Sequence, residues 1–283
     1  MANDSQLQSW AEQGSDWVDN APIFEAVLAP FAEAVMQVAD IGAGARVLDI
    51  GCGFGTLLQR AAALGAEPFG VDISDVMVQA ARRRVPAATV LLGDAQNVDL
   101  NAVGAGEPFD RIVSRFGVMF FDDPVAAFTN IRKSAAPGAR LAFVCWREGE
   151  NPIFTMGTRI LIDRMEAPHA APDPTAPGPL AFGNDNRVRA ILTDAGWADI
   201  HVEAFDGVCD YSGDGSDGVE DRLTMILSST TGQRARAELQ AQLGAQGWAG
   251  VVEEVRAELR RHLIDGLCKF PGHTWVFTAT NPG

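Results

Sequence analysis

Between residues 46 and 146, short apolar runs rich in β-branched residues alternate with segments of helical period. The runs read RVLDI, EPFGVD, TVLLGD, FDRIVSRF and RLAFVCW, and they end near residues 50, 72, 93, 115 and 146. Successive ends are 22, 21, 22 and 31 residues apart, which is the length that a strand, a crossover helix and two turns consume. The pattern predicts an α/β fold with a doubly wound, mostly parallel sheet.

Two further strands and several helices flank this core. A sixth strand is expected at DIHVEAF and a seventh at HTWVFTA, while glycine-rich residues 207–218 are expected to be irregular. Helices at about 235–243 and 251–264 would form a cap over the carboxyl ends of the strands. The expected units are N-terminal helices over the ligand site at 1–40, a core at 41–150, a loop and cap helices at 151–198, the last two core strands at 199–206 and 273–280, and a helical cap with the acceptor region at 207–272.

Acidic residues strongly outnumber basic residues in this chain. The chain has 22 Lys and Arg against 37 Asp and Glu, a net charge of −15 and a pI of about 4.6. Such a field repels phosphate backbones and anionic lipid surfaces. We therefore do not expect nucleic acid as a partner.

Targeting and metal-binding signatures are missing from the sequence. The N-terminus lacks a basic region followed by an apolar run, and no run of 18 apolar residues occurs. The four cysteines lie far apart, without histidines at metal-ligand spacing. We expect a cytoplasmic protein with no membrane insertion and no bound metal.

The first apolar run leads into DIGCGFG at residues 49–55. In open α/β sheets the ligand lies outside the carboxyl ends of the strands. Glycines at 51, 53 and 55 let the backbone turn tightly and approach a ligand, and the helix expected from Thr56 points its positive end at it. The motif indicates a nucleotide-type binding loop.

Acidic residues follow the second and third runs. Asp72 lies 21 positions after Gly51, where a carboxylate can accept both hydroxyls of a ribose. Asp94, Ala95 and Gln96 follow the third run, where an adenine ring would lie. An acid at the position of Asp72 occurs both in methyl-donor sites and in nicotinamide sites. An acid at the position of Asp94 is expected only in a methyl-donor site, so Asp94 favours that interpretation.

Five segments, VLDIGCGFG, VDISDVM, GDAQ, FDRIVSRFGVMFFDDP and PGARLAFVCW, together resemble a class I S-adenosylmethionine-dependent methyltransferase of the ubiquinone/menaquinone-methyltransferase-like group. The resemblance covers about residues 45–147 and implies S-adenosylmethionine as the cofactor. It implies that the glycine loop holds the methionine part, Asp72 the ribose, Ile73 and Met77 the faces of the adenine ring, and Asp94 with Ala95 its edge. The candidate cofactor contacts are Trp17, Asp49, Gly51, Cys52, Gly53, Asp72, Ile73, Met77, Asp94, Ala95, Gln96, Ser114, Arg115 and Phe116.

The same resemblance bears on the methyl acceptor. Phe116, Met119 and Phe120 would lie beside the reacting methyl group, which favours a small and partly apolar acceptor. The loop reads G-x-G-x-G rather than the G-x-G-x-x-G of dinucleotide enzymes. The Asn/Asp-Pro-Pro-aromatic motif of nucleic-acid amino methylases is also missing after the fourth run.

Three residues have open roles. Arg115 could anchor an anionic acceptor, but we favour a structural ion pair with Asp94, Asp110 or Asp122. Trp17 could close over the methionine part of the cofactor or attach a helix to the body. His169, in the Pro-rich loop expected to cover the site, is the best candidate for a general base.

The sequence therefore predicts an enzyme that transfers a methyl group from S-adenosylmethionine to an oxygen or carbon of a phenolic, polyketide-like, quinone-like or lipid-like metabolite. The partner expected is this small acceptor, and a homodimer stays open. Two alternatives are a nicotinamide-dependent oxidoreductase and a non-catalytic S-adenosylmethionine-binding protein.

Overall fold

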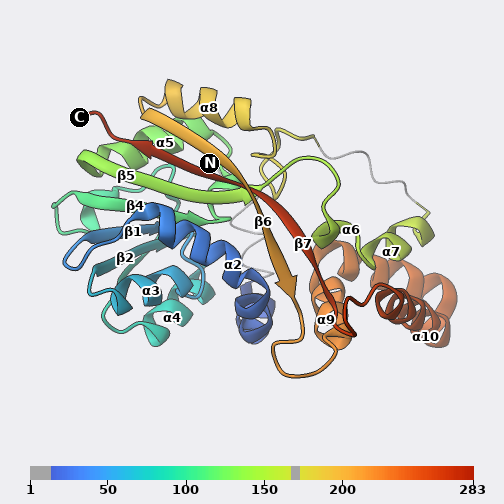
Figure 1. Ribbon diagram of the computed structural model, residues 1–283. Coiled ribbons are helices and arrows are strands. Elements are labelled where there is room, and N and C mark those ends of the chain that lie inside the picture. The colour runs from blue at the N-terminus through green and yellow to red at the C-terminus, as the bar shows by residue number, and fades with distance from the viewer. Residues whose placement is uncertain (1–13, 167–172) are drawn as a thin grey trace.

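The computed structural model describes residues 14–166 and 173–283, and its centre is one seven-stranded sheet (Figure 1). The strand order is β3-β2-β1-β4-β5-β7-β6, and among these strands β7 runs in the direction opposite to the other six. The strands are β1 (Arg46–Ile50), β2 (Glu67–Asp72), β3 (Thr89–Leu92), β4 (Phe109–Arg115), β5 (Ala135–Trp146), β6 (Ala198–Asp210) and β7 (Lys269–Thr280). The order reverses between β1 and β4, which confirms the doubly wound Rossmann-like fold.

Helices cover both faces of the sheet, and a second group extends beyond it. The helices are α2 (Ala21–Ala39), α3 (Thr56–Ala63), α4 (Asp75–Arg84), α5 (Pro124–Lys133), α6 (Pro152–Thr155), α7 (Thr158–Arg164), α8 (Asp185–Asp194), α9 (Val219–Ser228) and α10 (Thr230–Arg261), with 3-10 turns η1 (Leu100–Ala102) and η2 (Val118–Phe120). Helices α2, α3 and α4 pack on one face of the sheet, and α5 and α8 lie on the other (Figure 1). Residues 14–19 are also helical and precede α2.

Strand β5 lies at the middle of the core. Its residues from Leu141 to Trp146 are all buried, as expected for a strand covered on both faces. Phe143 stacks on Phe277 of β7 at 5.0 Å between ring centroids and contacts Phe128 of α5 at 5.6 Å. These contacts join the antiparallel strand to the parallel part of the sheet.

The β6–β7 pair is longer than the sequence pattern predicts. Residues 207–210, expected to be irregular, continue β6, and Gly207 pairs with Gly272 of β7. A Cβ atom at either glycine would lie 2.8 Å from the ring of Phe31. The expectation was wrong because these glycines allow close packing against α2 rather than ending the strand.

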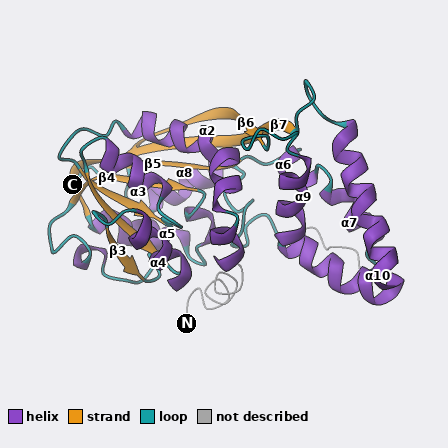
Figure 2. Cartoon of the chain, turned by 90° about the horizontal axis from the view of Figure 1, so that it is seen from below, coloured by secondary structure: helices purple, strands orange, loops and turns teal. Residues whose placement is uncertain are grey.

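The far ends of β6 and β7 carry the cap, in which α7, α9 and α10 stand apart from the core (Figure 2). Helix α9 was not predicted. The two cap helices expected at about 235–243 and 251–264 are joined in α10, which bends at Gly244, where φ is 72° and ψ is 176°. These values are not helical, so α10 consists of two helical segments that meet at a kink, and glycine tolerates the left-handed φ that the kink requires.

Helix α2 packs against β4, β5, β6 and β7. It is long and apolar enough to span a membrane by length and composition, but nine of its 19 residues are buried. Phe31 is fully buried and makes edge contacts with Phe116, Trp146 and Phe205 at 5.3–6.0 Å. The apolar character of α2 therefore serves packing against β4 to β7.

Phe31→Ala is expected to lower the free energy of unfolding by about 3–5 kcal/mol, because it leaves a cavity among three aromatic rings. Phe205→Ala is the matched control, since Phe205 contacts the same ring from a partly exposed position. Urea unfolding of the two variants and the parent checks this. A loss for Phe31→Ala no greater than for Phe205→Ala would contradict the role given to Phe31.

Candidate functional site

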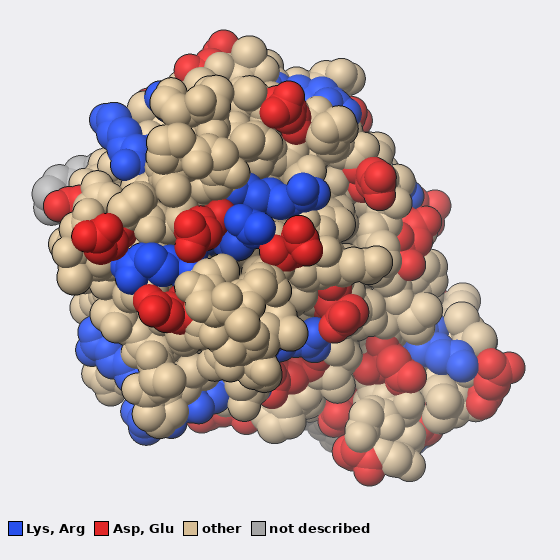
Figure 3. Space-filling model, turned by 60° about the vertical axis from the view of Figure 1, so that its left-hand side comes forward, with Lys and Arg blue, Asp and Glu red and all other residues tan. Residues whose placement is uncertain are grey.

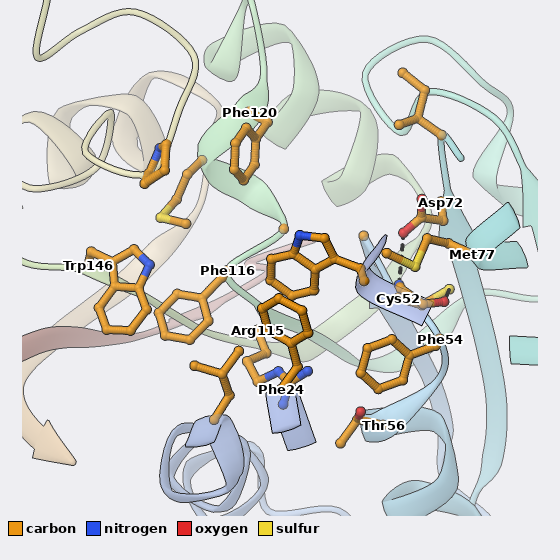
Figure 4. Close-up of a pocket in the computed structure, with 18 of the residues that line it drawn as sticks. Phe24, Cys52, Phe54, Thr56, Asp72, Met77, Arg115, Phe116, Phe120 and Trp146 are labelled. Atoms are coloured by element: carbon orange, nitrogen blue, oxygen red, sulfur yellow. Dashed lines mark hydrogen bonds between the residues drawn. The ribbon is translucent and has the colours of Figure 1, made fainter. Parts of the chain in front are cut away.

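A cavity of about 560 Å³ opens at the carboxyl ends of β1, β2 and β4, between the core and the cap (Figure 4). This volume lies within the roughly 300–1,000 Å³ of small-molecule sites. The residues singled out from the sequence that line the cavity are Trp17, Asp49, Gly51, Cys52, Gly53, Asp72, Ile73, Met77, Asp94, Ala95, Arg115, Phe116, Met119 and Phe120. His169 lies outside the described residues.

The loop after β1 adopts the positive φ values that its glycines allow. Gly51, Gly53 and Gly55 have φ values of 65°, 53° and 91°, which side-chain-bearing residues rarely adopt. The N–H groups of Gly51 and Cys52 both donate to the carbonyl of Val71 at 2.9 and 3.1 Å. A Cβ atom at Gly53 would meet no atom within 4 Å, so this part of the loop leaves open space beside the cavity.

Asp72, at the end of β2, is hydrogen-bonded to the glycine loop and to the residue before α4. Its Oδ2 accepts a hydrogen bond from the N–H of Gly53 at 2.8 Å, and its Oδ1 accepts one from the N–H of Ser74 at 2.9 Å. Burial raises the pKa of Asp72 above its ordinary value, and these backbone hydrogen bonds oppose the rise. The carboxylate is thereby held in one orientation, with lone pairs left for a ligand.

Asp49 and Arg115 place opposite charges at the floor of the cavity. Burial raises the pKa of Asp49 well above its ordinary value, and the charge of Arg115 opposes this rise. Burial likewise lowers the pKa of Arg115 to about 10, against the influence of Asp49. Neither side chain forms an ion pair within the described chain.

The ion pair expected for Arg115 with Asp94, Asp110 or Asp122 is not formed. Asp110 lies five positions earlier on the same strand, so its side chain points to the opposite face of the sheet, where it accepts from the N–H of Arg46. Asp94 follows β3, on the far side of β2 and β1 from β4. The charge of Asp49 acts most strongly on Arg115, because Asp49 pairs in register with Val113, two residues before Arg115.

Two other expected cofactor contacts, Gln96 and Ser114, do not line the cavity. Gln96 Oε1 accepts from the N–H of Asp123 at 2.9 Å. Ser114 Oγ donates to the carbonyl of Ile50 at 2.7 Å and accepts from the N–H of Gly117 at 3.2 Å. Both side chains hold loops together beneath the site instead of facing a ligand.

The other half of the cavity has an aromatic wall. Phe116 has φ of 63°, a strained value for a bulky residue. Its ring stacks on Trp146 with centroids 4.2 Å apart and planes 10° apart (Figure 4). Trp146 also makes an edge contact with Phe154, with centroids 5.4 Å apart. The strained turn after β4 therefore aims an aromatic ring along the cap side of the cavity.

Several lining residues escaped the sequence analysis because they come from remote segments. Trp146 ends β5, Ile153 and Phe154 belong to α6, and Met225 and Ile226 belong to α9. No motif marks them, although their apolar character fits a cap that faces the sheet. Trp17 was expected in one of two roles, and it lines the cavity while stacking on Phe24 of α2 at 3.7 Å.

Arg222 of α9 puts a buried positive charge on the cap side of the cavity. It is 3% exposed and donates to Tyr211 Oη at 3.1 Å and to the carbonyls of Ile153 and Met156 at 3.0 and 2.7 Å. Burial raises the pKa of Tyr211 to about 12, although the Arg222 charge opposes this. Arg222 therefore ties α9 to α6 and gives this end of the cavity a positive potential.

Comparison with known proteins finds a family match within the core. Residues 47–138 match the family described as a methyltransferase domain. A demethylmenaquinone methyltransferase of Paenarthrobacter aurescens is 26% identical over 181 residues, which are 61% of this chain and 70% of that protein. Aklanonic acid methyltransferase DauC of a Streptomyces species is 29% identical over 138 residues, 46% of this chain and 58% of that protein.

The sequence matches to these relatives extend over only part of this chain and part of each relative. Proteins of Mycobacterium that are 31% identical match over 129 residues, so the chain spans about half (47%) of their length. The structure of Haemonchus contortus phosphoethanolamine N-methyltransferase 2 superposes with a TM-score of 0.53 at 20% identity, covering 95% of this chain and 60% of that one. This likeness shows a common fold.

Asp49→Asn is expected to stabilise the protein increasingly as the pH rises. Because the folded protein raises the pKa of Asp49 above its ordinary 3.8, the stability linked to this carboxyl is fully present below that value and is lost as the pH rises through the folded value. An asparagine at position 49 does not ionise, so the variant does not lose this stability as the pH rises. Urea unfolding between about pH 4 and about pH 8 should show the stability of the variant gaining on the parent.

The control for this measurement is Asp194→Asn, an exposed carboxyl at the end of α8. Its stability should follow that of the parent across the same pH range. If the Asp49→Asn curve also ran parallel to the parent, the burial cost assigned to Asp49 would be wrong.

Proposed function

We propose that the protein transfers a methyl group from S-adenosylmethionine to an oxygen or carbon atom of a small, partly apolar metabolite, since residues 47–138 match the methyltransferase-domain family. The observation that carries this proposal is one continuous cavity with two different halves. A glycine loop and two acids form one half, and stacked aromatic rings form the other. A donor and an acceptor could lie there in contact.

The residues of the first half fit S-adenosylmethionine. The open space beside Gly53 admits a ligand against the backbone, and Asp72 keeps lone pairs for the two ribose hydroxyls. Met77 and Ile73 line the cavity next to Asp72, and Asp94 with Ala95 lines it after β3. When bound, S-adenosylmethionine supplies an already activated methyl group.

The second half would align the acceptor and exclude water, which are the main tasks of a protein in a displacement of this kind. Phe116, Trp146 and Phe154 offer flat apolar faces to a planar molecule. Among residues 14–166 and 173–283, no histidine lines the cavity. The positive potential of Arg222 favours an acceptor whose reacting atom is an oxygen or carbon of an ionised phenol or enol.

The names of the relatives support this class of acceptor. Demethylmenaquinone and aklanonic acid, named for two relatives, are a quinone-type and a polyketide-type metabolite. We propose a phenolic, quinone-like or polyketide-like acceptor for this chain as well, and His169 keeps its proposed role as a general base for acceptors that need one.

The charge and the surface favour a small-molecule partner, and we propose that the protein acts in the cytoplasm. The net charge is −15, and acidic and basic side chains are interspersed on the face seen in Figure 3. An acidic protein repels nucleic acid and anionic membranes. We propose that it acts on a soluble metabolite, without membrane insertion, and a homodimer is compatible with this proposal.

Calorimetric titration of the purified protein with adenosylhomocysteine, NAD and NADP tests the cofactor. We expect saturable binding of adenosylhomocysteine and of neither dinucleotide. Asp72→Ala should weaken that binding by about 1–3 kcal/mol, because the ribose hydroxyls lose their acceptor. Asp75→Ala, an exposed neighbour in α4, should leave it unchanged.

Binding of a dinucleotide instead would support the oxidoreductase alternative and overturn the proposed function. Cofactor binding without turnover on any member of a panel of phenols, hydroxyquinones and β-keto esters would support the non-catalytic alternative. Unchanged affinity in Asp72→Ala would remove Asp72 from the ribose site.

Trp146→Leu tests the acceptor wall. The loss of one stacked ring is expected to lower kcat/KM for an aromatic acceptor about tenfold, since aromatic pairs contribute about 0.5–1.5 kcal/mol beyond their buried area, while adenosylhomocysteine affinity stays the same. Trp275→Leu is the control, because Trp275 pairs with Cys145 and so points to the opposite face of the sheet from Trp146. Equal effects of both substitutions would contradict the placement of the acceptor.

A further inference from the structure

Arg222 of α9 is a buried cation whose hydrogen-bond partners carry no charge. It is 3% exposed and lines the cavity. It donates to the phenol oxygen of Tyr211 and to the carbonyls of Ile153 and Met156. Among the described residues, its Nε is one of the buried polar atoms that have no hydrogen-bond partner. Buried polar atoms are nearly always paired in proteins, so this one needs an explanation.

The side chains around Arg222 do not neutralise it. Burial raises the pKa of Tyr211 and of Cys209 to about 12, so both groups stay uncharged at neutral pH. The guanidinium carbon lies 5.2 Å from the ring centroid of Phe270, in a cation–π contact that attracts the cation without neutralising it. Across residues 14–166 and 173–283, no carboxylate forms an ion pair with Arg222. A buried charge is costly unless it is paired, which points to an anionic ligand.

The strand order places Arg222 at the far end of the cavity from the glycine loop. Asp72 and the glycine loop follow β2 and β1, whereas Phe116 follows β4 and Trp146 ends β5. The segments that hold Arg222 lie around the ends of β6 and β7, beside α6 and α9 (Figure 1). In the sheet these strands follow one another as β2-β1-β4-β5-β7-β6. The cavity therefore runs from the donor half, past the aromatic rings, to a guanidinium.

One face of α9 brings this cation to the cavity. Arg222, Met225, Ile226 and Ser229 follow one another at helical spacing, and all four line the cavity. Met225 and Ile226 are apolar, so the charge on this face is confined to Arg222. The face therefore offers a planar apolar molecule one charged contact, at the end away from the donor.

We infer that Arg222 binds a carboxylate of the acceptor, at the opposite end of that molecule from the atom that receives the methyl group. This inference deepens the proposed function and rests on it, because the donor half fixes where transfer takes place. Guanidinium groups match carboxylates in geometry as well as in charge, and hydrogen bonds between such groups are strong. The positive potential still favours an ionised reacting atom, but the direct contact of Arg222 is with the carboxylate. The acceptor class is then a planar aromatic acid, and the methylated product keeps its carboxylate.

Two acid–amide pairs test this anchor: 4-hydroxybenzoate with 4-hydroxybenzamide, and 6-hydroxy-2-naphthoate with 6-hydroxy-2-naphthamide. Each amide keeps the shape and the phenol of its acid but lacks the negative charge. The full chain is titrated calorimetrically with all four probes, with and without saturating adenosylhomocysteine. We expect the parent to bind at least one acid about 10- to 100-fold more tightly than its amide, the usual effect of a hydrogen bond between charged groups.

Arg222→Met should remove this preference by weakening the acid, while the affinities for the amide and for adenosylhomocysteine stay the same. Arg222→Lys keeps the charge and should retain part of the preference. Arg256→Met is the matched control, because Arg256 also belongs to the cap but pairs with Glu220 and Glu253 and does not line the cavity. It should keep the full preference for the acid.

The possible failures are distinguishable. If the parent did not bind adenosylhomocysteine, the proposed function would be wrong, and the titrations without it would still report on the carboxylate. If the parent bound neither acid more tightly than its amide, or if the preference survived in Arg222→Met, the carboxylate site would be overturned and the proposed function would stand. A methyl ester as product, in place of a methyl ether, would also overturn it. Should Arg222→Met not fold, the comparison of acid with amide in the parent and in Arg222→Lys decides.

Discussion

The close approach of two loop backbones, at Gly51 after β1 and Gly117 after β4, is the constraint on which the site depends. A Cβ atom at Gly117 would lie 2.5 Å from the carbonyl oxygen of Ile50, and one at Gly51 would lie 2.8 Å from Cα of Gly117. Ser114 joins the two loops through its hydroxyl, which donates to Ile50 and accepts from Gly117. Since β1 and β4 flank the point where the strand order reverses, this contact shapes the cavity floor and brings Asp49 and Arg115 together.

The same contact explains the strained conformation of Phe116. With Gly117 held against β1, the chain leaves β4 with φ of 63° at Phe116, and the ring turns onto Trp146. The strain is offset by packing, because the fully buried Phe31 supports Phe116 and Trp146 from α2. One helix therefore stabilises the aromatic wall and, through Gly207 and Gly272, the strands that carry the cap.

The sequence contains the core of this arrangement because the core is built from local signals. The spacing of the apolar runs, the glycines after β1 and the acid at residue 72 can each be read from short segments of sequence. Spacing alone therefore predicts β1 to β5 and the loop after β1. Residue parity along β4 would also have shown that Asp110 and Arg115 point to opposite faces. The sequence predicts only in part what depends on contacts between distant segments. The glycines of β6 resemble a loop until Phe31 is seen against them, and α9 supplies Met225 and Ile226 without any motif.

The charges at the floor suggest how donor and product could be distinguished in the proposed reaction. Asp49 and Asp72 bring two carboxyl groups to the loop against one guanidinium, Arg115. Burial raises the pKa of both carboxyls, so a cationic ligand is favoured because it allows them to stay ionised. S-adenosylmethionine carries one net positive charge through its sulfonium, whereas adenosylhomocysteine is neutral overall. In the proposed reaction, the buried acids would then favour the cationic donor over the neutral product.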